Sequence, residues 1–412
     1  MANQPIQRGA DGADARVGGS LATRAVHSGE RPPRPDFTPT AMPIYPASAF
    51  IYDDTNIQDA VFGNEREGYV YSRYGNPTVR AFEQAITALE GTEDAIAFAS
   101  GVGAVYAAIM LDAKVGDTVV AAPNVYGATY ATLSRIAPEH GINVRFCDVQ
   151  DLVELERVVR EVKPTLVVCE TISNPLMRVS NIPEVTRIAH AAGAKVMVDN
   201  TFASPMLVNP ARFGVDSVVH SGTKYIGGHG DATGGVIAAS RERVAALREN
   251  NKLVGAVLSG FDAWLLLRGI KTLPLRVKQH SANAREVAAW LNSDPRVARV
   301  NYAGLNPPSP ADAQFNSDDR GGMISFDIKG AGRDEVFRFQ DSLKLILPAT
   351  TLGDVWSLVL YPAISSHRAI PEVERAKIGI GDGLVRLSVG IEDVNDIIVD
   401  LDQALASAVA NY

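Results

Sequence analysis

The sequence predicts an α/β fold with a mainly parallel sheet in a large domain and a smaller C-terminal α+β domain. Through the first two thirds of the chain, short continuous apolar runs rich in valine alternate with amphipathic helical patterns. Such runs are typical of strands covered on both faces of a parallel sheet. Beyond Gly255 the strand patterns instead alternate apolar and polar residues, which indicates a half-exposed antiparallel sheet.

Composition narrows the possible functions. At 412 residues the chain is long enough for two domains with cores of their own. The net charge of −8 argues against a nucleic-acid partner or an anionic membrane. Because no membrane span and no apolar signal core is found, we expect a cytoplasmic protein. The two cysteines, Cys147 and Cys169, lie in apolar runs and are expected to be buried free thiols.

Residues 1–73 are predicted to form an N-terminal arm, and residues 24–75 show no clear helical pattern. Residues 1–20 are rich in Ala, Gly and Asp and are expected to be a disordered tail. The rest of the arm is rich in proline and aromatic residues, and a neighbouring subunit would supply a surface to cover those rings. Near its end, Tyr71 and Arg73 place an aromatic and a basic side chain just ahead of a helix.

The large domain is predicted to span residues 74–268. Its first helix follows Asn76, a good N-cap, and stops at Gly91. Helices and strands then alternate, with strands expected at 95–99, 119–122, 144–146, 166–169, 196–198 and before Ser221, and intervening helices at 101–113, 152–162 and 183–192. The small domain is predicted to span residues 269–412. Long helical patterns at about 255–269 and 275–291 lead into it, and strands at 323–328 and 384–391 and a helix at 394–410 follow.

The carboxyl ends of the predicted parallel strands carry chemically useful residues, and ligands of such sheets bind there. After the first strand, Gly101 and Val102 open a helix whose free N–H groups suit a phosphate, although close packing would explain the glycine equally well. Tyr126 follows the second strand, where an aromatic side chain could also be core packing. Asn174 follows the fourth strand, four residues after a carboxylate, Glu170.

Two further strand ends carry charged residues. Asp199 directly follows a buried strand, which is costly unless a cation pairs with it, although Asp is also a good helix cap. Lys224 follows Ser221 and Thr223 and precedes a glycine cluster. By itself it could be a surface lysine, or an amine that burial makes nucleophilic.

Together, the five strand ends fit one cofactor, pyridoxal 5′-phosphate. Lys224 would form the Schiff base, and Asp199 would keep the pyridine nitrogen protonated. Tyr126 would stack on the ring, and Asn174 would bond the ring hydroxyl. The groups expected to hold the phosphate are Gly101, Val102, Ser221 and Thr223.

Seven motifs extend this pattern over the chain from about Ala22 to the C-terminus. They are YSRYGNPT at 71–78, SGVG at 100–103, VYG at 125–127, ETISNP at 170–175, VDNTFA at 198–203, SGTKY at 221–225 and RLSVG at 386–390. With these motifs the chain resembles the Cys/Met-metabolism family of pyridoxal-phosphate enzymes. That family includes cystathionine γ-synthase, the cystathionine lyases, methionine γ-lyase and the homoserine-ester sulfhydrylases.

The resemblance implies a fold-type I enzyme that assembles as a homotetramer of two active-site dimers. It implies that Tyr71 and Arg73 reach the phosphate of the neighbouring subunit and that Arg386 binds the substrate carboxylate. Tyr126 would also take part in proton transfer. Lys224, once displaced by the amino acid, would carry a proton so that a group leaves from Cγ. Water then yields a 2-oxo acid and ammonia, whereas a thiol yields a thioether.

Departures from the family pattern bear on the substrate. Ala128 stands where methionine γ-lyases commonly have cysteine, and Trp356 replaces a glutamate of the cystathionine enzymes that helps to recognise the distal amino group. Thr351 stands at the substrate site where the family often has serine, and it keeps the hydroxyl. The pair Gly353-Asp354 is similar to the residues that sulfhydrylases and methionine γ-lyases have at this position. We therefore expect a methionine γ-lyase-like enzyme. The alternatives are a cystathionine γ-synthase or γ-lyase and an O-acetyl- or O-succinylhomoserine sulfhydrylase.

Readings from other classes have less support. Ser221 and Lys224 match the Ser-x-x-Lys of penicillin-binding serine hydrolases, but the Ser-Asp-Asn and Lys-Thr-Gly strings are missing from the sequence. A binding protein without activity would not need Lys224, Asp199 and Arg386 together. No histidine spacing suggests a metal, so we expect none.

Overall fold

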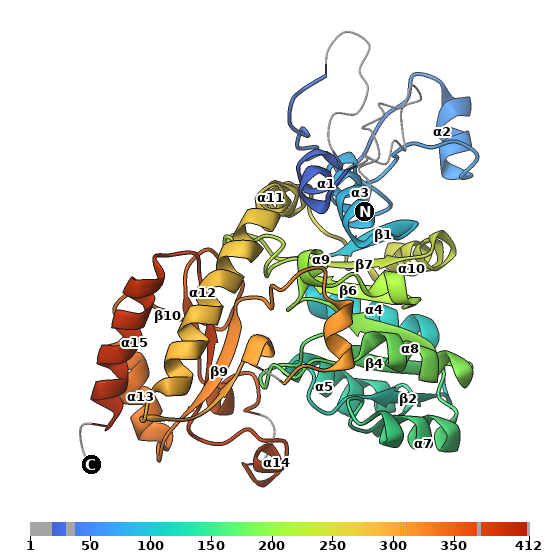
Figure 1. Ribbon diagram of the computed structural model, residues 1–412. Helices are drawn as coiled ribbons and strands as arrows, with labels where there is room; N and C mark the ends of the chain where they lie inside the picture. The colour runs from blue at the N-terminus through green and yellow to red at the C-terminus, as the bar shows by residue number, and fades with distance from the viewer. Residues whose placement is uncertain (1–18, 30–37, 306, 369–371, 410–412) are drawn as a thin grey trace.

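The computed structural model describes residues 19–29, 38–305, 307–368 and 372–409. Residues 1–18 of the predicted tail lie outside the described residues. Two bodies lie side by side, each built on its own sheet, and helix α12 (Leu273–Ser293) runs from the top of the large body down the small one (Figure 1). The residue boundaries given above for the arm and the two domains stay a prediction.

The large sheet confirms the predicted α/β class. Its seven strands lie in the order β1-β7-β6-β5-β4-β2-β3, and all are parallel except β7, which runs antiparallel to both neighbours. The strands are β1 (Asp94–Phe98), β2 (Thr118–Ala121), β3 (Asn143–Phe146), β4 (Leu166–Glu170), β5 (Lys195–Asp199), β6 (Ser217–Ser221) and β7 (Gly235–Ala239). All of these strands except β7 were predicted from the sequence.

Helices cover both faces of the large sheet, which is why its central strands are continuously apolar. One face packs against α3 (Pro77–Glu90), α7 (Leu152–Val162), α8 (Ile182–Ala191) and α11 (Gly260–Ile270). The other packs against α4 (Gly101–Asp112) and α10 (Arg241–Val254). The predicted signals of α3 are confirmed, since the Asn76 side chain accepts the Thr78 N–H at 2.9 Å and Gly91 ends the helix at φ +75°.

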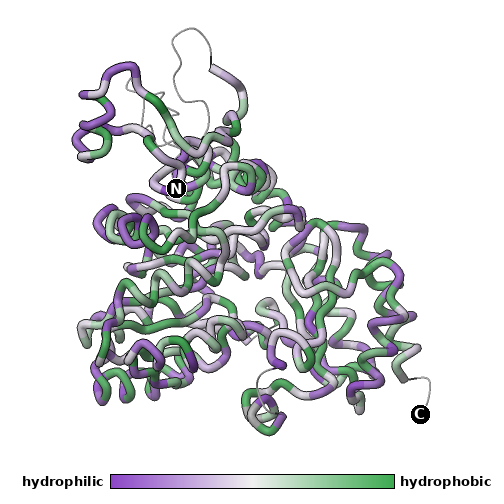
Figure 2. Tube along the Cα trace, turned by 180° about the vertical axis from the view of Figure 1, so that it is seen from behind, coloured by the Kyte–Doolittle hydropathy of each residue, from purple (hydrophilic) through white to green (hydrophobic). Residues whose placement is uncertain are grey.

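Shorter helical segments connect these elements. They are α5 (Gly127–Ala131), a π-helical turn (Thr132–Ile136), α6 (Ala137–Glu139) and α9 (Ser204–Leu207). Cys147 and Cys169 are buried free thiols, as expected. In both bodies, hydrophobic positions gather in the interior and hydrophilic ones on the outer helices and loops (Figure 2). In the described parts of the chain, no helix has the length and apolar character that a membrane crossing requires.

The small sheet has five strands in the order β10-β11-β12-β9-β8, antiparallel except for the short β10–β11 pair. They are β8 (Val297–Asn301), β9 (Met323–Ile328), β10 (Leu347–Pro348), β11 (Leu358–Leu360) and β12 (Leu384–Ser388). Helices α12, α13 (Arg333–Ser342) and α15 (Val394–Val409) cover one face, and α14 (Glu372–Lys377) lies nearer the large body (Figure 1).

The expectation of a half-exposed sheet is wrong for the central strands. All residues of β12 are buried, and β9 is buried except at Asp327. The polar residues Arg386 and Ser388 face away from the helices, but that face is covered too. Arg386 bonds Asn174 of the large body, and Met323 packs among large-body side chains. The alternating pattern therefore marks a face turned towards a site rather than towards solvent.

The arm contains two helices that the sequence analysis did not expect. They are α1 (Leu21–His27), capped by Ser20, and α2 (Thr55–Phe62), capped by Asp54. The segment with α2 extends away from the large body (Figure 1) and exposes large apolar side chains, with Ile51 93% and Phe62 55% exposed.

Candidate active site

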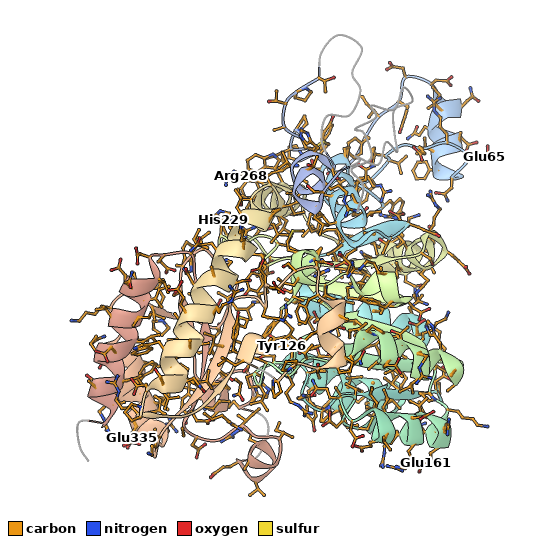
Figure 3. All side chains as sticks on the ribbon, viewed as in Figure 1. Glu65, Tyr126, Glu161, His229, Arg268 and Glu335 are labelled. Carbon is orange, nitrogen blue, oxygen red and sulfur yellow. The ribbon has the colours of Figure 1, made fainter. Side chains whose placement is uncertain are left out.

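Strand ends of the large sheet meet at one edge of it. Strands β2, β4, β5 and β6 are successive neighbours, and Glu170 of β4 pairs in register with Asp199 of β5. Glu170 also accepts the Tyr126 backbone N–H at 2.7 Å and the Asn174 N–H at 3.1 Å. Tyr126 therefore stands over these strand ends, at the junction of the two bodies (Figure 3). Glu170 was not predicted as a site residue, although an acid at the end of a strand is a signal in the sequence.

The first turn of α4 presents backbone N–H groups that no described residue bonds. Ser100 caps this helix by accepting the Gly103 N–H at 3.1 Å, whereas no acceptor among the described residues bonds the N–H groups of Gly101 or Val102. A Cβ on Gly101 would lie 2.7 Å from the Ser221 Cβ, so only glycine lets the helix approach that hydroxyl so closely. Free N–H groups at a helix N-terminus beside a hydroxyl fit a phosphate group.

Thr223 lies two residues beyond Ser221 in the loop that carries Lys224. Its Oγ1 accepts the Gly234 N–H at 3.0 Å, which ties this loop to the residue before β7. The Ser221 backbone N–H donates to the Thr201 hydroxyl at 2.8 Å. Both predicted phosphate-binding hydroxyls thus belong to a backbone that is held at two points.

Asp199 presents one oxygen to the site. Its Oδ1 accepts the Thr201 N–H at 3.0 Å and the Thr201 hydroxyl at 2.5 Å, whereas no donor among the described residues bonds Oδ2. Burial raises the pKa of Asp199, and the Thr201 bonds and the nearby His220 partly offset that rise. The pKa of Glu170 is raised well above its usual value by burial and by the Asp199 charge. A cation, such as a protonated pyridine nitrogen, would stabilise the buried Glu170 and the adjacent half-buried Asp199.

Lys224 has the environment of a nucleophilic amine. Its Nζ donates to the Thr351 hydroxyl at 3.0 Å. Burial and the Arg386 charge lower the pKa of Lys224 to about 8, while Asp354 acts in the opposite direction. A substantial neutral fraction near pH 7 to 8 makes this amine reactive towards a carbonyl.

Arg386 of β12 is a buried cation without a carboxylate partner among the described residues. It is 3% exposed and donates to the Asn174 Oδ1 and the Thr351 carbonyl, each at 3.2 Å. Burial lowers the pKa of Arg386 to about 10, so the guanidinium keeps its charge at neutral pH. Arg386, Asn174, Thr351 and Lys224 thus form one connected cluster that joins the two bodies, and a substrate carboxylate would supply the missing anion.

Tyr71 and Arg73 lie apart from this cluster within one chain. The Arg73 guanidinium stacks over the Tyr74 ring at 4.8 Å, lies 5.6 Å from the Tyr71 ring centre and donates to the Lys252 carbonyl. The small cavity that Arg73 lines is formed by residues of α3, β1 and α10 and their adjoining loops, and none of the other predicted site residues borders it. Tyr71 is 44% exposed.

The residues that depart from the family pattern surround the same region. Trp356 is 37% exposed, and its ring would lie 3.0 Å from a Cβ on Gly230, in the loop after Lys224. Ala128 lies on α5, and the preceding Gly127 packs against the Ser366 carbonyl.

Comparison with known proteins identifies the family. The family model for "Cys/Met metabolism PLP-dependent enzyme" matches residues 22–406. The chain belongs to this family. It is 40% identical to L-methionine γ-lyase of Pseudomonas putida and 39% identical to O-succinylhomoserine sulfhydrylase of Mycobacterium tuberculosis. Each alignment covers 94% of this chain, with 98% and 96% of the respective relative.

Solved structures of family members share the fold. Cystathionine γ-synthase of Xanthomonas oryzae pv. oryzae matches with a TM-score of 0.89 and 35% identity, over 96% of this chain and 100% of that one. An O-acetylhomoserine (thiol)-lyase of Campylobacter jejuni matches with a TM-score of 0.88 and 31% identity, over 94% and 100%, and carries a pyridoxyl-lysine monophosphate. The predicted fold-type I architecture and pyridoxal phosphate cofactor are confirmed, and the protein is a pyridoxal-phosphate enzyme of sulfur amino acid metabolism. Elimination or replacement at Cγ is the chemistry that these relatives support. Membership of this family excludes the interpretation as a serine hydrolase.

Proposed function

We propose that the protein is a methionine γ-lyase-like enzyme that acts on methionine or a homoserine-type substrate, with Lys224 as the residue that binds the cofactor. The observation that carries this proposal is the Lys224–Thr351–Arg386 cluster, where a reactive amine lies beside a free cation. Bound pyridoxal phosphate would supply an electron sink for negative charge on the carbon next to the amino group. The remaining chemistry falls to residues of the chain.

Each side chain has a proposed task. Arg386, with Asn174 and Thr351 behind it, binds the substrate carboxylate and so fixes the Cα–H bond near Lys224. Lys224 Nζ, when it is neutral, takes a proton from Cα. It then carries this proton to a neighbouring atom, so that a group can leave from Cγ. Tyr126, 41% exposed and close enough to raise the pKa of the Arg386 guanidinium, moves a proton at the far side of the substrate.

The cofactor-binding tasks follow the geometry of the strand ends. Asp199 Oδ2 would hold a protonated ring nitrogen. The N–H groups of Gly101 and Val102 and the hydroxyls of Ser221 and Thr223 would hold the phosphate. Asn174 would bond the ring hydroxyl.

The choice between substrates rests on Trp356. An indole lacks the charge that would pair with the distal amino group of cystathionine, which favours a shorter and less charged side chain. The test is a substrate panel of methionine, cystathionine, O-acetylhomoserine and O-succinylhomoserine, with and without a thiol, in which 2-oxo acid and thioether are both measured. We expect 2-oxo acid from methionine or thioether from a homoserine ester, and Trp356→Glu should raise the relative use of cystathionine. Cystathionine as the best substrate of the unmodified enzyme would contradict the proposal.

We further propose a cytoplasmic homotetramer of two active-site dimers in which Tyr71 and Arg73 serve the neighbouring subunit. The separation of both residues from Lys224 within one chain and the exposed apolar arm support this assembly. Mixed oligomers of Arg73→Ala and Lys224→Ala chains should regain part of the activity that each variant lacks alone. Arg66→Ala, an exposed arginine of the same arm, is the control and should leave activity unchanged. No recovery in the mixture would contradict the shared site.

A further inference from the structure

Asp354 is a buried acid that the site described so far does not use. The residue is 0% exposed, and neither carboxylate oxygen accepts a hydrogen bond of normal geometry from the described residues, although the Gly230 N–H lies near. Burying a carboxylate without hydrogen bonds is costly. The nearby Gly230 N–H offsets little of this cost, so the buried charge itself calls for an explanation.

The segment around Asp354 packs directly on the loop that carries Lys224. A Cβ on Gly353 would lie 2.7 Å from the Tyr225 backbone nitrogen, and the Val355 N–H donates to the Gly228 carbonyl at 2.9 Å. A Cβ on Gly230 would lie 3.3 Å from the Asp354 Oδ2. Asp354 is therefore held against the backbone that immediately follows Lys224.

Three basic groups lie near enough to lower the pKa of Asp354 through their charge, namely Lys224, His229 and Arg276. Arg276 is 4% exposed. Its guanidinium donates hydrogen bonds to the carbonyls of Tyr225, Ile226 and Gly269 and to the Thr272 hydroxyl. His229 bonds the Gly227 carbonyl through Nδ1 at 2.7 Å. Lys224 is the one of the three that the proposed reaction requires to gain and lose a proton.

We propose that Asp354 is a positioning residue for Lys224, whose buried negative charge favours the protonated state of the Lys224 nitrogen and so sets the pH at which that nitrogen releases its proton. This inference rests on the proposed role of Lys224. Facing Lys224 are the Arg386 charge, which opposes protonation, and the Thr351 hydroxyl. Burial raises the pKa of Asp354 to about 6, so the carboxylate is mostly ionised at neutral pH and its charge is lost only in acid.

The test is a pH titration of the visible absorption band of the cofactor-loaded enzyme, which reports the protonation of the Lys224 nitrogen. Asp354→Asn should lower the titration midpoint by about one pH unit, since an opposite charge is removed. Asp354→Glu keeps the charge, so its titration midpoint should lie close to that of the unmodified enzyme. Asp327→Asn, which removes a part-buried carboxylate paired with Arg299 in the small sheet, is the matched control and should titrate like the unmodified enzyme.

Stability separates this role from a structural one. Because Asn removes an unbonded buried charge, the thermal midpoint of Asp354→Asn should not fall. An unchanged titration midpoint, an equal shift in Asp354→Glu, or a variant that fails to fold would overturn the proposal. Absence of a pyridoxyl group on Lys224 in the unmodified enzyme would instead overturn the proposed function itself.

Discussion

Replacement of Arg386 by leucine should remove most of the affinity for the substrate carboxylate. A buried guanidinium can give two parallel charge-assisted hydrogen bonds to a carboxylate, each worth about 1.5–3 kcal/mol. Their loss amounts to about 3–6 kcal/mol, which is a fall in kcat/KM of about 10²–10⁴-fold. Arg386→Lys keeps the charge but cannot form the bidentate pair. Its kcat/KM should lie between that of Arg386→Leu and that of the unmodified enzyme.

Steady-state kinetics with the best substrate of the panel would measure the effect, mainly as a rise in KM. Arg299→Leu, which removes an exposed arginine paired with Asp327, should change kcat/KM by less than about twofold. Since Asn174 and Thr351 lose a donor when Arg386 is removed, the thermal midpoint and the bound cofactor should be measured alongside. A kcat/KM within a few-fold of the unmodified enzyme, with the fold and cofactor intact, would refute the assignment of Arg386.

Three further predictions concern the cofactor site and its support. Gly101→Ala should weaken pyridoxal phosphate binding about tenfold in equilibrium dialysis, since overpacking costs ~1–3 kcal/mol, whereas Gly103→Ala, with its nearest neighbour at 3.2 Å, should change it little. Attachment of the cofactor to Lys224 in the cofactor-free protein should speed up with pH and level off above a pKa of about 8, because the neutral amine reacts; a rate that keeps rising towards the ordinary lysine pKa would contradict this. Glu90→Gln should lower the free energy of unfolding by about 3 kcal/mol, because Glu90 and His220 form a pair at 2.6 Å with both side chains at most 1% exposed; an unchanged denaturant midpoint would contradict it.

Local signals were sufficient where a residue acts on its own neighbours in sequence. The helix at 77–90 was predicted because Asn76 caps it and Gly91 ends it, and both act within a few residues. The strand ends were predictable as a group because the carboxyl ends of parallel strands share one edge, which brings Asp199 and Ser221 together, and Lys224 follows Ser221 by only three residues. The parts of the site that follow from sheet topology could therefore be read from the sequence.

Features that depend on distant partners could not be predicted in the same way. The alternating pattern of β12 predicted exposure because sequence does not say that Arg386 faces the large body. The bond of Glu170 to Tyr126 and the position of Asp354 near Lys224 became known only from the structure, since each pair lies far apart in the chain. Helices α1 and α2 are short, and their patterns were too brief to distinguish them from the irregular arm around them.

The residue that carries the cofactor is the most direct test of the role proposed for Lys224. The purified protein would be reduced with borohydride, digested and mapped by mass spectrometry, with Lys224→Ala as the control. We expect a yellow protein whose reduced pyridoxyl phosphate is found on the peptide that contains Lys224, and a Lys224→Ala variant that has no such modification and no turnover. A colourless protein with full activity, or a pyridoxyl group on another lysine, would contradict the assignment of Lys224 as the residue that binds the cofactor.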